Sequence, residues 1–219
     1  MPAVHALVVL NGDLPDAPWL AAQAGAVDLV VAADGAADAL FAAGCRPGLV
    51  VGDLDSLPPA TVALLEEAGV PIERHPREKD ATDGELALRA AVARGATVIR
   101  VAGALGGSRA DQSIASLLLL ALPGLEAVDV ALVTPTDTVR VLRGPVTHRL
   151  TGRPGDLVSL LPLSARVSGV TTAGLRYVLD DATLEQGPTL GVSNELVASE
   201  ATIEIGTGAL IVTTHRAYH

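Results

Sequence analysis

Two kinds of segment alternate through the first 135 residues, and this alternation constrains the fold more than any other feature of the chain. Short runs rich in Val and Ile are separated by longer stretches rich in Ala and Leu, several of which are followed by a glycine. Val- and Ile-rich runs without polar alternation are typical of strands buried on both faces. Strands that alternate with helices at this spacing predict a mostly parallel sheet flanked by helices.

This pattern places six strands and four helices. The predicted strands are His5–Leu10, Leu29–Ala33, Leu49–Gly52, Ile72–His75, Val98–Ala102 and Val128–Thr134. The predicted helices are Gly35–Ala43, Pro59–Ala68, Asp83–Arg94 and Asp111–Leu122, and Gly44, Gly69 and Gly95 stand where helices commonly end.

The helical pattern stops near Pro135, and the remaining chain predicts a different kind of domain. Its apolar segments are broken by Gly and Pro and predict strands at Thr138–Leu142, Val146–Leu150, Leu157–Pro162, Val167–Leu179 and Ala201–Thr214. We therefore expect an α/β domain over residues 1–135 and an all-β, sandwich-like domain over residues 136–219, with a small barrel as the alternative.

Composition excludes several classes of partner. The chain has 219 residues, of which 49% are hydrophobic and four are aromatic, and its net charge is −10. Such a chain cannot present a large basic surface or many stacking platforms, so we expect neither nucleic acid nor a membrane as partner. Cys45 is the single cysteine, which excludes an intrachain disulfide. The apolar runs are too short to span a bilayer, and we expect a cytoplasmic protein.

Aspartates follow two of the predicted strands. Asp34 follows the second strand, and Asp53 and Asp55 follow the third in the run GDLDSL. Ligands of open parallel sheets bind beyond the carboxyl ends of the strands. If the backbone stays extended, Asp53 and Asp55 point to one side, roughly 6–7 Å apart, a spacing that can bracket a hard cation. Helix capping by Asp34 and simple turns at Asp53 and Asp55 are the alternatives.

The segment HPREKDATDGELAL, residues 75–88, combines acids with the chain's single lysine. Thr82 and Glu85 fit a capping box, and Asp83 would lie in the first helical turn. Lys79 stands out because the other 14 basic residues are arginines. An ammonium is a compact charge suited to a phosphate oxygen or to a carboxylate cluster.

A glycine-rich segment, GALGGSRADQS, follows the fifth predicted strand and precedes a helix. Glycines let a backbone approach phosphate closely, and a helix N-terminus offers unpaired N–H groups. Arg109 adds a planar donor, whereas Asp111 can be an N-cap or a ligand. The segment matches neither the G-x-x-x-x-G-K-[ST] loop nor G-x-G-x-x-G.

Taken together and in order, these segments resemble the thiamine pyrophosphokinase family. The matching runs are LNG, AADGA, LVVGDLDSL, EKDATDGELAL, GALGGSRADQSIAS, GVTTAGLRYVL and GVSNEL, which extend from Leu10 to Leu196. The resemblance implies an α/β nucleotide domain followed by a β-sandwich. It also implies transfer of the diphosphate of ATP to the hydroxyl of thiamine, with Mg²⁺ required and AMP released.

The resemblance assigns roles to particular residues. The implied metal ligands are Asp53, Asp55, Asp80 and Asp83, and the implied catalytic groups are Asp55, Asp80, Asp83 and Lys79. Nucleotide and phosphate contacts are implied for Asn11, Asp34, Gly35, Thr82, Lys79, Arg109, Asp111 and Gln112. Thiamine contacts are implied for Tyr177, Ser193 and Asn194, and the base that accepts the hydroxyl proton for Asp83 or Asp80. Ser108 and Gln112 depart from the run G-G-R-x-D-H of many bacterial members.

The resemblance also implies a homodimer with thiamine near the subunit contact, and the position of the residues favours the same arrangement. The acids lie in the first domain and Ser193 and Asn194 in the second, so phosphate and thiamine must meet between domains. Three alternatives remain open: a diphosphokinase acting on a hydroxymethyl-pterin, a Mg²⁺-dependent phosphohydrolase, and a non-catalytic nucleotide sensor.

Overall fold

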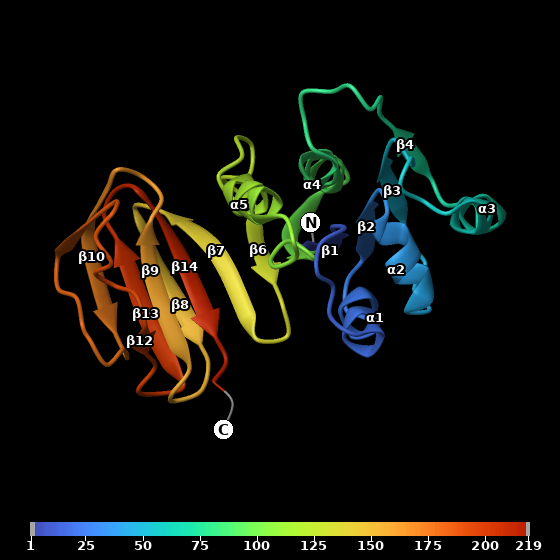
Figure 1. Ribbon diagram of the computed structural model, residues 1–219. Coiled ribbons are helices and arrows are strands. Elements are labelled where there is room, and N and C mark those ends of the chain that lie inside the picture. The colour runs from blue at the N-terminus through green and yellow to red at the C-terminus, as the bar shows by residue number, and fades with distance from the viewer. Residues whose placement is uncertain (1–2, 218–219) are drawn as a thin grey trace. The chain divides into compact units, whose positions relative to one another are not determined.

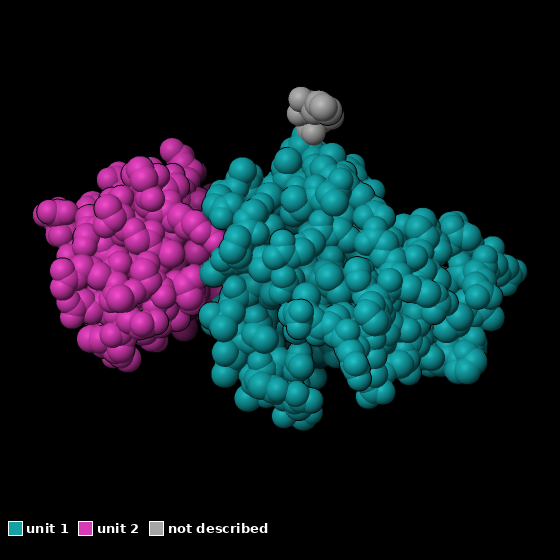
Figure 2. All heavy atoms as spheres, turned by 90° about the horizontal axis from the view of Figure 1, so that it is seen from above, with its two compact units in different colours: residues 1–135 teal, residues 136–219 magenta. Residues whose placement is uncertain are grey.

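The computed structural model describes residues 3–217 and divides the chain into two compact units, Met1–Pro135 and Thr136–His219 (Figures 1 and 2). Residues 1–2 and 218–219 lie outside the described range, Tyr218 among them. Unit 1 is an α/β layer and unit 2 consists of two packed antiparallel sheets, so the predicted fold class is confirmed. None of the helices in the described range combines the length and apolarity needed to cross a bilayer.

Unit 1 contains six strands and five helices within its described residues. They are β1 (Val4–Val9), α1 (Ala17–Gly25), β2 (Leu29–Ala33), α2 (Ala36–Ala42), β3 (Leu49–Gly52), α3 (Pro59–Glu67), β4 (Ile72–Arg74), α4 (Asp83–Ala93), β5 (Ala96–Ala102), α5 (Ala110–Leu119) and β6 (Asp129–Val133). Helix α1 is absent from the prediction. Asp16 begins it by accepting a hydrogen bond from the Trp19 backbone N–H (2.9 Å), and Pro18 follows in the first turn. That pairing was the available sequence signal.

The strands of unit 1 pair in parallel, in the order β6-β5-β1-β2-β3-β4. The chain moves outward from β1 to β4 and then returns past β1 to β5. Right-handed crossovers therefore place α1 and α2 on one face and α4 and α5 on the other (Figure 1). The carboxyl ends of β1, β2, β3 and β5 meet at one edge, and the order reverses there between β1 and β5.

The core of unit 1 is aliphatic, as the composition requires. Leu7, Leu40, Val50 and Leu65 are fully buried between the sheet and the helices on the α1–α2 face, and Trp19 and Phe41 pack against them. Complete burial of each such side chain stabilises the unit by about 1.5–3 kcal/mol.

Unit 2 contains β7 (Asp137–Arg143), β8 (Val146–Thr151), β9 (Leu157–Pro162), β10 (Arg166–Ala173), β11 (Ala182–Glu185), β12 (Asn194–Glu195), β13 (Glu200–Ile205) and β14 (Ala209–His215). Within this unit the strands form two sheets, β12-β9-β14-β7 and β11-β10-β13-β8. Buried residues of both sheets share one core, which is the predicted sandwich rather than a barrel. This core includes Leu160 and Leu210 from one sheet, and Val170 and Ile203 from the other.

Two predicted strands of unit 2 are wrong in part, and glycine explains both. The run 201–214 is two strands in different sheets, separated by Gly206, Thr207 and Gly208. The run 167–179 stops being a regular strand after Ala173 because Gly174 adopts φ +78°. A side chain at Gly174 would put its Cβ 2.4 Å from the Glu200 carbonyl oxygen. The chain leaves the sheet at Gly174 and forms a loop that carries Tyr177.

Candidate active site

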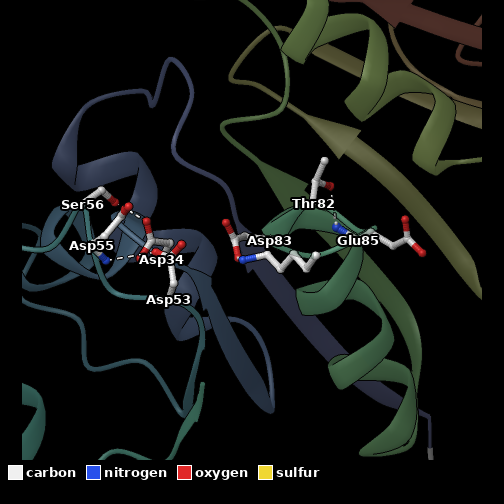
Figure 3. A network of polar contacts seen from close by, with 8 residues as sticks. Asp34, Asp53, Asp55, Ser56, Thr82, Asp83 and Glu85 are labelled. Atoms are coloured by element: carbon white, nitrogen blue, oxygen red, sulfur yellow. Dashed lines mark hydrogen bonds and ion pairs between the residues drawn. The ribbon is translucent and has the colours of Figure 1, made fainter. Parts of the chain in front are cut away.

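Three carboxylates converge at the carboxyl ends of two paired strands. Asp34 follows β2, and Asp53 and Asp55 follow β3, its parallel neighbour (Figure 3). One oxygen from each carboxylate lies within 4.8 Å of an oxygen of each of the others. This carboxylate cluster, Asp34 with Asp53 and Asp55, joins two of the implied metal ligands to an aspartate for which the resemblance implied a phosphate contact.

The local route to the cluster differs from the extended backbone on which the prediction depended. Leu54 has φ +66°, so the chain turns between the two acids of β3. The Asp55 backbone N–H donates to Asp53 Oδ1 (3.0 Å), and this bond closes the turn. The extended backbone was therefore a wrong premise, and a tight turn brings the two carboxylates together.

Asp34 is the buried member of the cluster, with 9% of its surface exposed. Its backbone N–H donates to the Val51 carbonyl oxygen (2.8 Å), and the Ser56 hydroxyl donates to its Oδ2. Its Oδ1 is buried and has no hydrogen-bond partner among the described residues. Gly52 permits this approach, because a Cβ there would lie 2.9 Å from the Asp34 Cβ. An uncompensated carboxylate oxygen is costly unless a cation binds it.

The other two acids of the cluster, Asp53 and Asp55, affect each other's proton affinity. The hydrogen bond from the Asp55 backbone N–H lowers the pKa of Asp53, whereas the negative charge of Asp53 raises the pKa of Asp55. Repulsion of this kind is relieved by a positive charge placed between the groups. Three carboxylates with neither His nor Cys among them form a donor set that fits Mg²⁺ better than Zn²⁺.

The start of α4 supplies the second part of the site. Thr82 caps this helix by accepting a hydrogen bond from the Glu85 backbone N–H (3.2 Å), as the sequence predicts (Figure 3). The Glu85 carboxylate bonds to Arg89 (2.9 Å), so half of the expected capping box forms. Lys79 Nζ lies 2.8 Å from Asp83 Oδ1, and this contact raises the pKa of Lys79. The lysine side chain is partly buried, with 14% of its surface exposed.

A cavity of about 620 Å³ joins these groups within unit 1. Its lining includes many of the residues expected from the sequence: Asn11, Asp34, Asp55, Thr82, Asp83, Arg109 and Gln112. These residues come from segments that follow β1, β2, β3, β4 and β5. The topology therefore gathers distant motifs around one hollow at the edge where the strand order reverses.

The remaining expected residues of unit 1 stand outside this lining. Asp53 belongs to the carboxylate cluster, and Lys79 meets the cavity through Asp83. Gly35 lies behind the cavity wall, where a Cβ would be 2.7 Å from Asn11 Nδ2. Asp80 is exposed, and the structure records no contact between its side chain and the cluster in the described range.

The glycine-rich loop is held by residues that sequence reasoning missed. Gly107 donates its N–H to Asp13 Oδ2 (2.7 Å), and the Ser113 hydroxyl donates to the Gly106 carbonyl oxygen (2.9 Å). Ser56 and Arg77, which line the cavity, were missed too. Ser56 stands in the GDLDS run that the sequence singled out, so its position was an available signal. Asp13 carried none, because the loop that it holds is 94 positions away.

Arg109 and Asp111 form a bidentate ion pair, with Nε–Oδ1 at 2.8 Å and Nη2–Oδ2 at 2.5 Å. Arg109 lowers the pKa of Asp111 to about 2 and has its own pKa raised by the same contact. Helix α5 begins at Ala110, so Arg109 occupies the N-cap position and Asp111 lies in the first turn. Asp111 therefore does not cap the helix.

The expected thiamine-binding residues all lie in unit 2. Tyr177 is 66% exposed on the loop after β10, and Val178, Leu190 and Val192 are further exposed apolar side chains of this unit. Ser193 is exposed, whereas Asn194 is 3% exposed and hydrogen-bonds to the Tyr177 peptide.

Two family models match this chain, and together they define its class, an ATP-dependent diphosphotransferase. Residues 22–131 match the family model of the thiamin pyrophosphokinase catalytic domain, and residues 147–212 match that of the thiamin pyrophosphokinase vitamin B1 binding domain. The chain belongs to the thiamine pyrophosphokinase family, and the resemblance seen in the sequence is confirmed.

Individual relatives agree with the family models. Thiamine pyrophosphokinase of Bacillus subtilis is 28% identical over 173 residues, which cover 79% of this chain and 80% of the relative. Thiamine pyrophosphokinase 1 of Oryza sativa is 26% identical over 97% of this chain and 87% of its own. The solved thiamin pyrophosphokinase of Geobacillus thermodenitrificans has a TM-score of 0.82 at 29% identity, covering 97% of this chain and 98% of its own.

Proposed function

We propose that this chain transfers the diphosphate group of ATP to the hydroxyl of thiamine and releases AMP. The observation that carries the proposal is the cavity of unit 1, which joins the carboxylate cluster to Thr82, Asp83 and Arg109. Family membership supplies the substrate class, and a matched vitamin B1 binding domain supports thiamine as the acceptor.

A magnesium ion fits the carboxylate cluster, and we propose Asp34, Asp53 and Asp55 as the residues that would hold it. The support is the buried Oδ1 of Asp34, which is unpaired among residues 3–217, together with an all-oxygen donor set. A bound Mg²⁺ would neutralise charge on the phosphate oxygens as the diphosphate leaves AMP. Asp83 and Asp80, the other proposed ligands, lie on the next acidic segment, and Asp83 lines the cavity.

The remaining groups of unit 1 act mainly by positioning and by charge. Diphosphate transfer spreads negative charge over several oxygens, so cations held in fixed places stabilise the transition state. Lys79 is kept charged by Asp83, and Arg109 presents a guanidinium to the cavity. Asn11, Gly35, Thr82, Asp111 and Gln112 complete the proposed contacts with the nucleotide and its phosphates. Of the two candidate bases, we favour Asp83 because it lines the cavity whereas Asp80 does not.

Thiamine is proposed to bind unit 2 at Tyr177, Ser193 and Asn194. The exposed phenol ring of Tyr177 offers a flat apolar surface, and the Ser193 hydroxyl offers a polar contact. We further propose a cytoplasmic homodimer with thiamine near the subunit contact. Ile114 and Leu118 support an association surface, because these neighbours on α5 are 59% and 53% exposed.

The decisive experiment identifies the products. Purified protein is incubated with ATP, Mg²⁺ and one acceptor at a time: thiamine, a hydroxymethyl-pterin, or none. The proposal expects thiamine diphosphate and AMP in equal amounts when thiamine is the acceptor, and no AMP with the pterin or without an acceptor. A diphosphorylated pterin, or phosphate released without an acceptor, would establish one of the two enzymatic alternatives. Nucleotide binding without turnover would establish the sensor.

The dimer has its own test. Asp55→Asn, which should be inactive, and Asn194→Ala, which should be impaired at thiamine concentrations well below its KM, are mixed after the subunits are dissociated and reassociated. Activity is then measured at such a concentration. If each site uses residues of both subunits, some mixed dimers contain one intact site, and activity rises above the average of the two variants. A monomer at working concentration, or mixtures that stay at that average, would show that each chain builds its own site.

A further inference from the structure

The side chain of Asn194 is almost entirely occupied by the protein's own backbone. Its Oδ1 accepts hydrogen bonds from the backbone N–H groups of Tyr177 (3.0 Å) and Glu195 (2.9 Å). Its Nδ2 donates to the Tyr177 carbonyl oxygen (2.7 Å). Because Asn194 is 3% exposed, three of its four hydrogen-bonding positions are already used in a buried setting.

These bonds reproduce the pairing of two antiparallel strands with a side chain in place of one strand. Just before Tyr177, the backbones pair directly: the Arg176 N–H donates to the Glu195 carbonyl (2.9 Å), and the Val197 N–H donates to the Gly174 carbonyl (3.1 Å). At Tyr177 the Asn194 carboxamide replaces the backbone partner, since it offers one acceptor and one donor to a single residue. The hydrogen-bond ladder is therefore extended by one residue, to the position where the loop carries the exposed ring.

The loop depends on this extension because it has left the sheet. Gly174 turns it out of β10, and Thr172 holds its far end, accepting a hydrogen bond from the Leu179 N–H at Oγ1 (2.9 Å). Between these anchors, Asn194 is the residue that fixes both the N–H and the C=O of Tyr177. The Tyr177 ring is 66% exposed, so packing does little to set its direction.

Ser193 presents the opposite arrangement. Its φ is +58°, an uncommon backbone conformation for serine, and its N–H donates to the Ser159 hydroxyl (3.0 Å). Its own hydroxyl makes no hydrogen bond to other residues in the described range. Of these two adjacent polar residues, Asn194 hydrogen-bonds to the protein backbone with its side chain, and Ser193 keeps its hydroxyl available for a ligand.

We propose that Asn194 is a positioning residue: its carboxamide holds the Tyr177 peptide and thereby places the Tyr177 ring against thiamine, while Ser193 makes the polar contact. This inference rests on the proposed function, because it assumes that thiamine binds here. It revises the thiamine contacts proposed above: Asn194 acts through Tyr177 and not on thiamine itself.

A double-mutant cycle tests this division. Asn194→Asp keeps the shape but puts a carboxylate oxygen against the Tyr177 carbonyl, and Asn194→Ala is the neutral second variant. We expect either change to raise the KM for thiamine about tenfold, with kcat and the KM for ATP altered less than twofold. In a Tyr177→Ala background the same change should add nothing further. Additive effects would mean direct contact with thiamine, and equal losses for both substrates would mean general disorder; either overturns the proposal.

A second arm needs no substrate. Tyr177→Trp in a Trp19→Phe background makes residue 177 the single Trp, whose fluorescence anisotropy reports its mobility. Asn194→Ala should lower that anisotropy, whereas the matched control Glu195→Gln, which breaks only the exposed pair with Arg176, should not. Unchanged anisotropy with Asn194→Ala would overturn the proposal. If the unmodified protein makes no thiamine diphosphate, the proposed function fails, and this arm still decides whether Asn194 holds residue 177.

Discussion

Asp34 in unit 1 and Asp156 in unit 2 are both buried aspartates, with 9% and 7% of their surfaces exposed. Asp156 is satisfied by the backbone: its Oδ2 accepts from the Arg153 N–H (2.8 Å) and its Oδ1 from the Ala217 N–H (3.1 Å). Asp34 accepts one hydroxyl bond from Ser56, and its other oxygen has no hydrogen-bond partner in the described range.

This difference distinguishes a carboxylate whose two oxygens are both hydrogen-bonded from one that has an oxygen left over for a ligand. Asp156 links the turn at Arg153 to Ala217, so both of its oxygens are hydrogen-bonded within unit 2. Asp34 lies beside two further carboxylates, and folding alone does not offset their repulsion. Ion-binding sites commonly carry such unfavourable repulsion in the absence of the ion, because a group whose hydrogen bonds are all made within the protein cannot also bind an ion.

The largest expected effect is on turnover, at the cluster itself. Asp53→Asn or Asp55→Asn should lower kcat by about 100-fold or more, because each removes a charged ligand from the proposed cation site. Steady-state rates of AMP formation measure this loss, and circular dichroism checks that the fold is kept. Glu67→Gln, an exposed acid on α3, is the matched control. Near-normal turnover in both cluster variants would contradict the proposal that Asp53 and Asp55 bind Mg²⁺.

Substitution of Lys79, the partly buried cation of the site, should show the next largest effect. Lys79→Arg keeps the charge but replaces a compact ammonium with a wide guanidinium in a place where 14% of the side chain is exposed. We expect kcat at saturating thiamine to fall about tenfold, because phosphate charge is no longer neutralised at the same point. An unchanged rate would show that Lys79 merely pairs with Asp83.

The two buried aspartates should respond oppositely when their charges are removed. Asp156→Asn places an amide N–H against a backbone N–H and should lower the free energy of unfolding by about 1–3 kcal/mol. Asp34→Asn should leave that free energy unchanged or raise it, while turnover falls. Urea unfolding of both variants alongside AMP assays makes the comparison. Equal destabilisation by the two changes would contradict the distinction drawn between them.

The smallest effect is expected at the exposed pair of Arg109 and Asp111, whose side chains are 67% and 62% exposed. Arg109 lowers the pKa of Asp111 from 3.8 to about 2. A lowered pKa contributes stability above pH 3.8 that is lost as the pH falls toward 2. Asp111→Asn should therefore lower the melting temperature slightly at pH 7 and by less at pH 2. A shift that grows on acidification would reverse the sign and refute the assignment.

Sequence reasoning located many residues that line the candidate site, because chemistry and local order coincide there. Asp34, Asp53 and Asp55 follow Val-rich strands, and parallel pairing brings the ends of such strands together whatever the details of the turn. Thr82 caps α4 through a bond to a residue three positions away, which a local pattern can reveal. Asp13 holds a loop 94 positions away, and no local pattern reports such a contact.

The sequence by itself determined the class of fold, the family and the residues that carry charge, since hydrophobic period and ordered motifs are local properties. Tertiary structure decided how those residues are used. Leu54 turns the chain so that two acids converge. Within the described part of the chain, burial leaves one Asp34 oxygen unpaired, whereas both oxygens of Asp156 accept a hydrogen bond. It also directs the Asn194 side chain to the Tyr177 backbone. The physical reason is that a polar side chain binds whichever partners the folded chain brings within about 3 Å of it, and sequence spacing does not specify those partners.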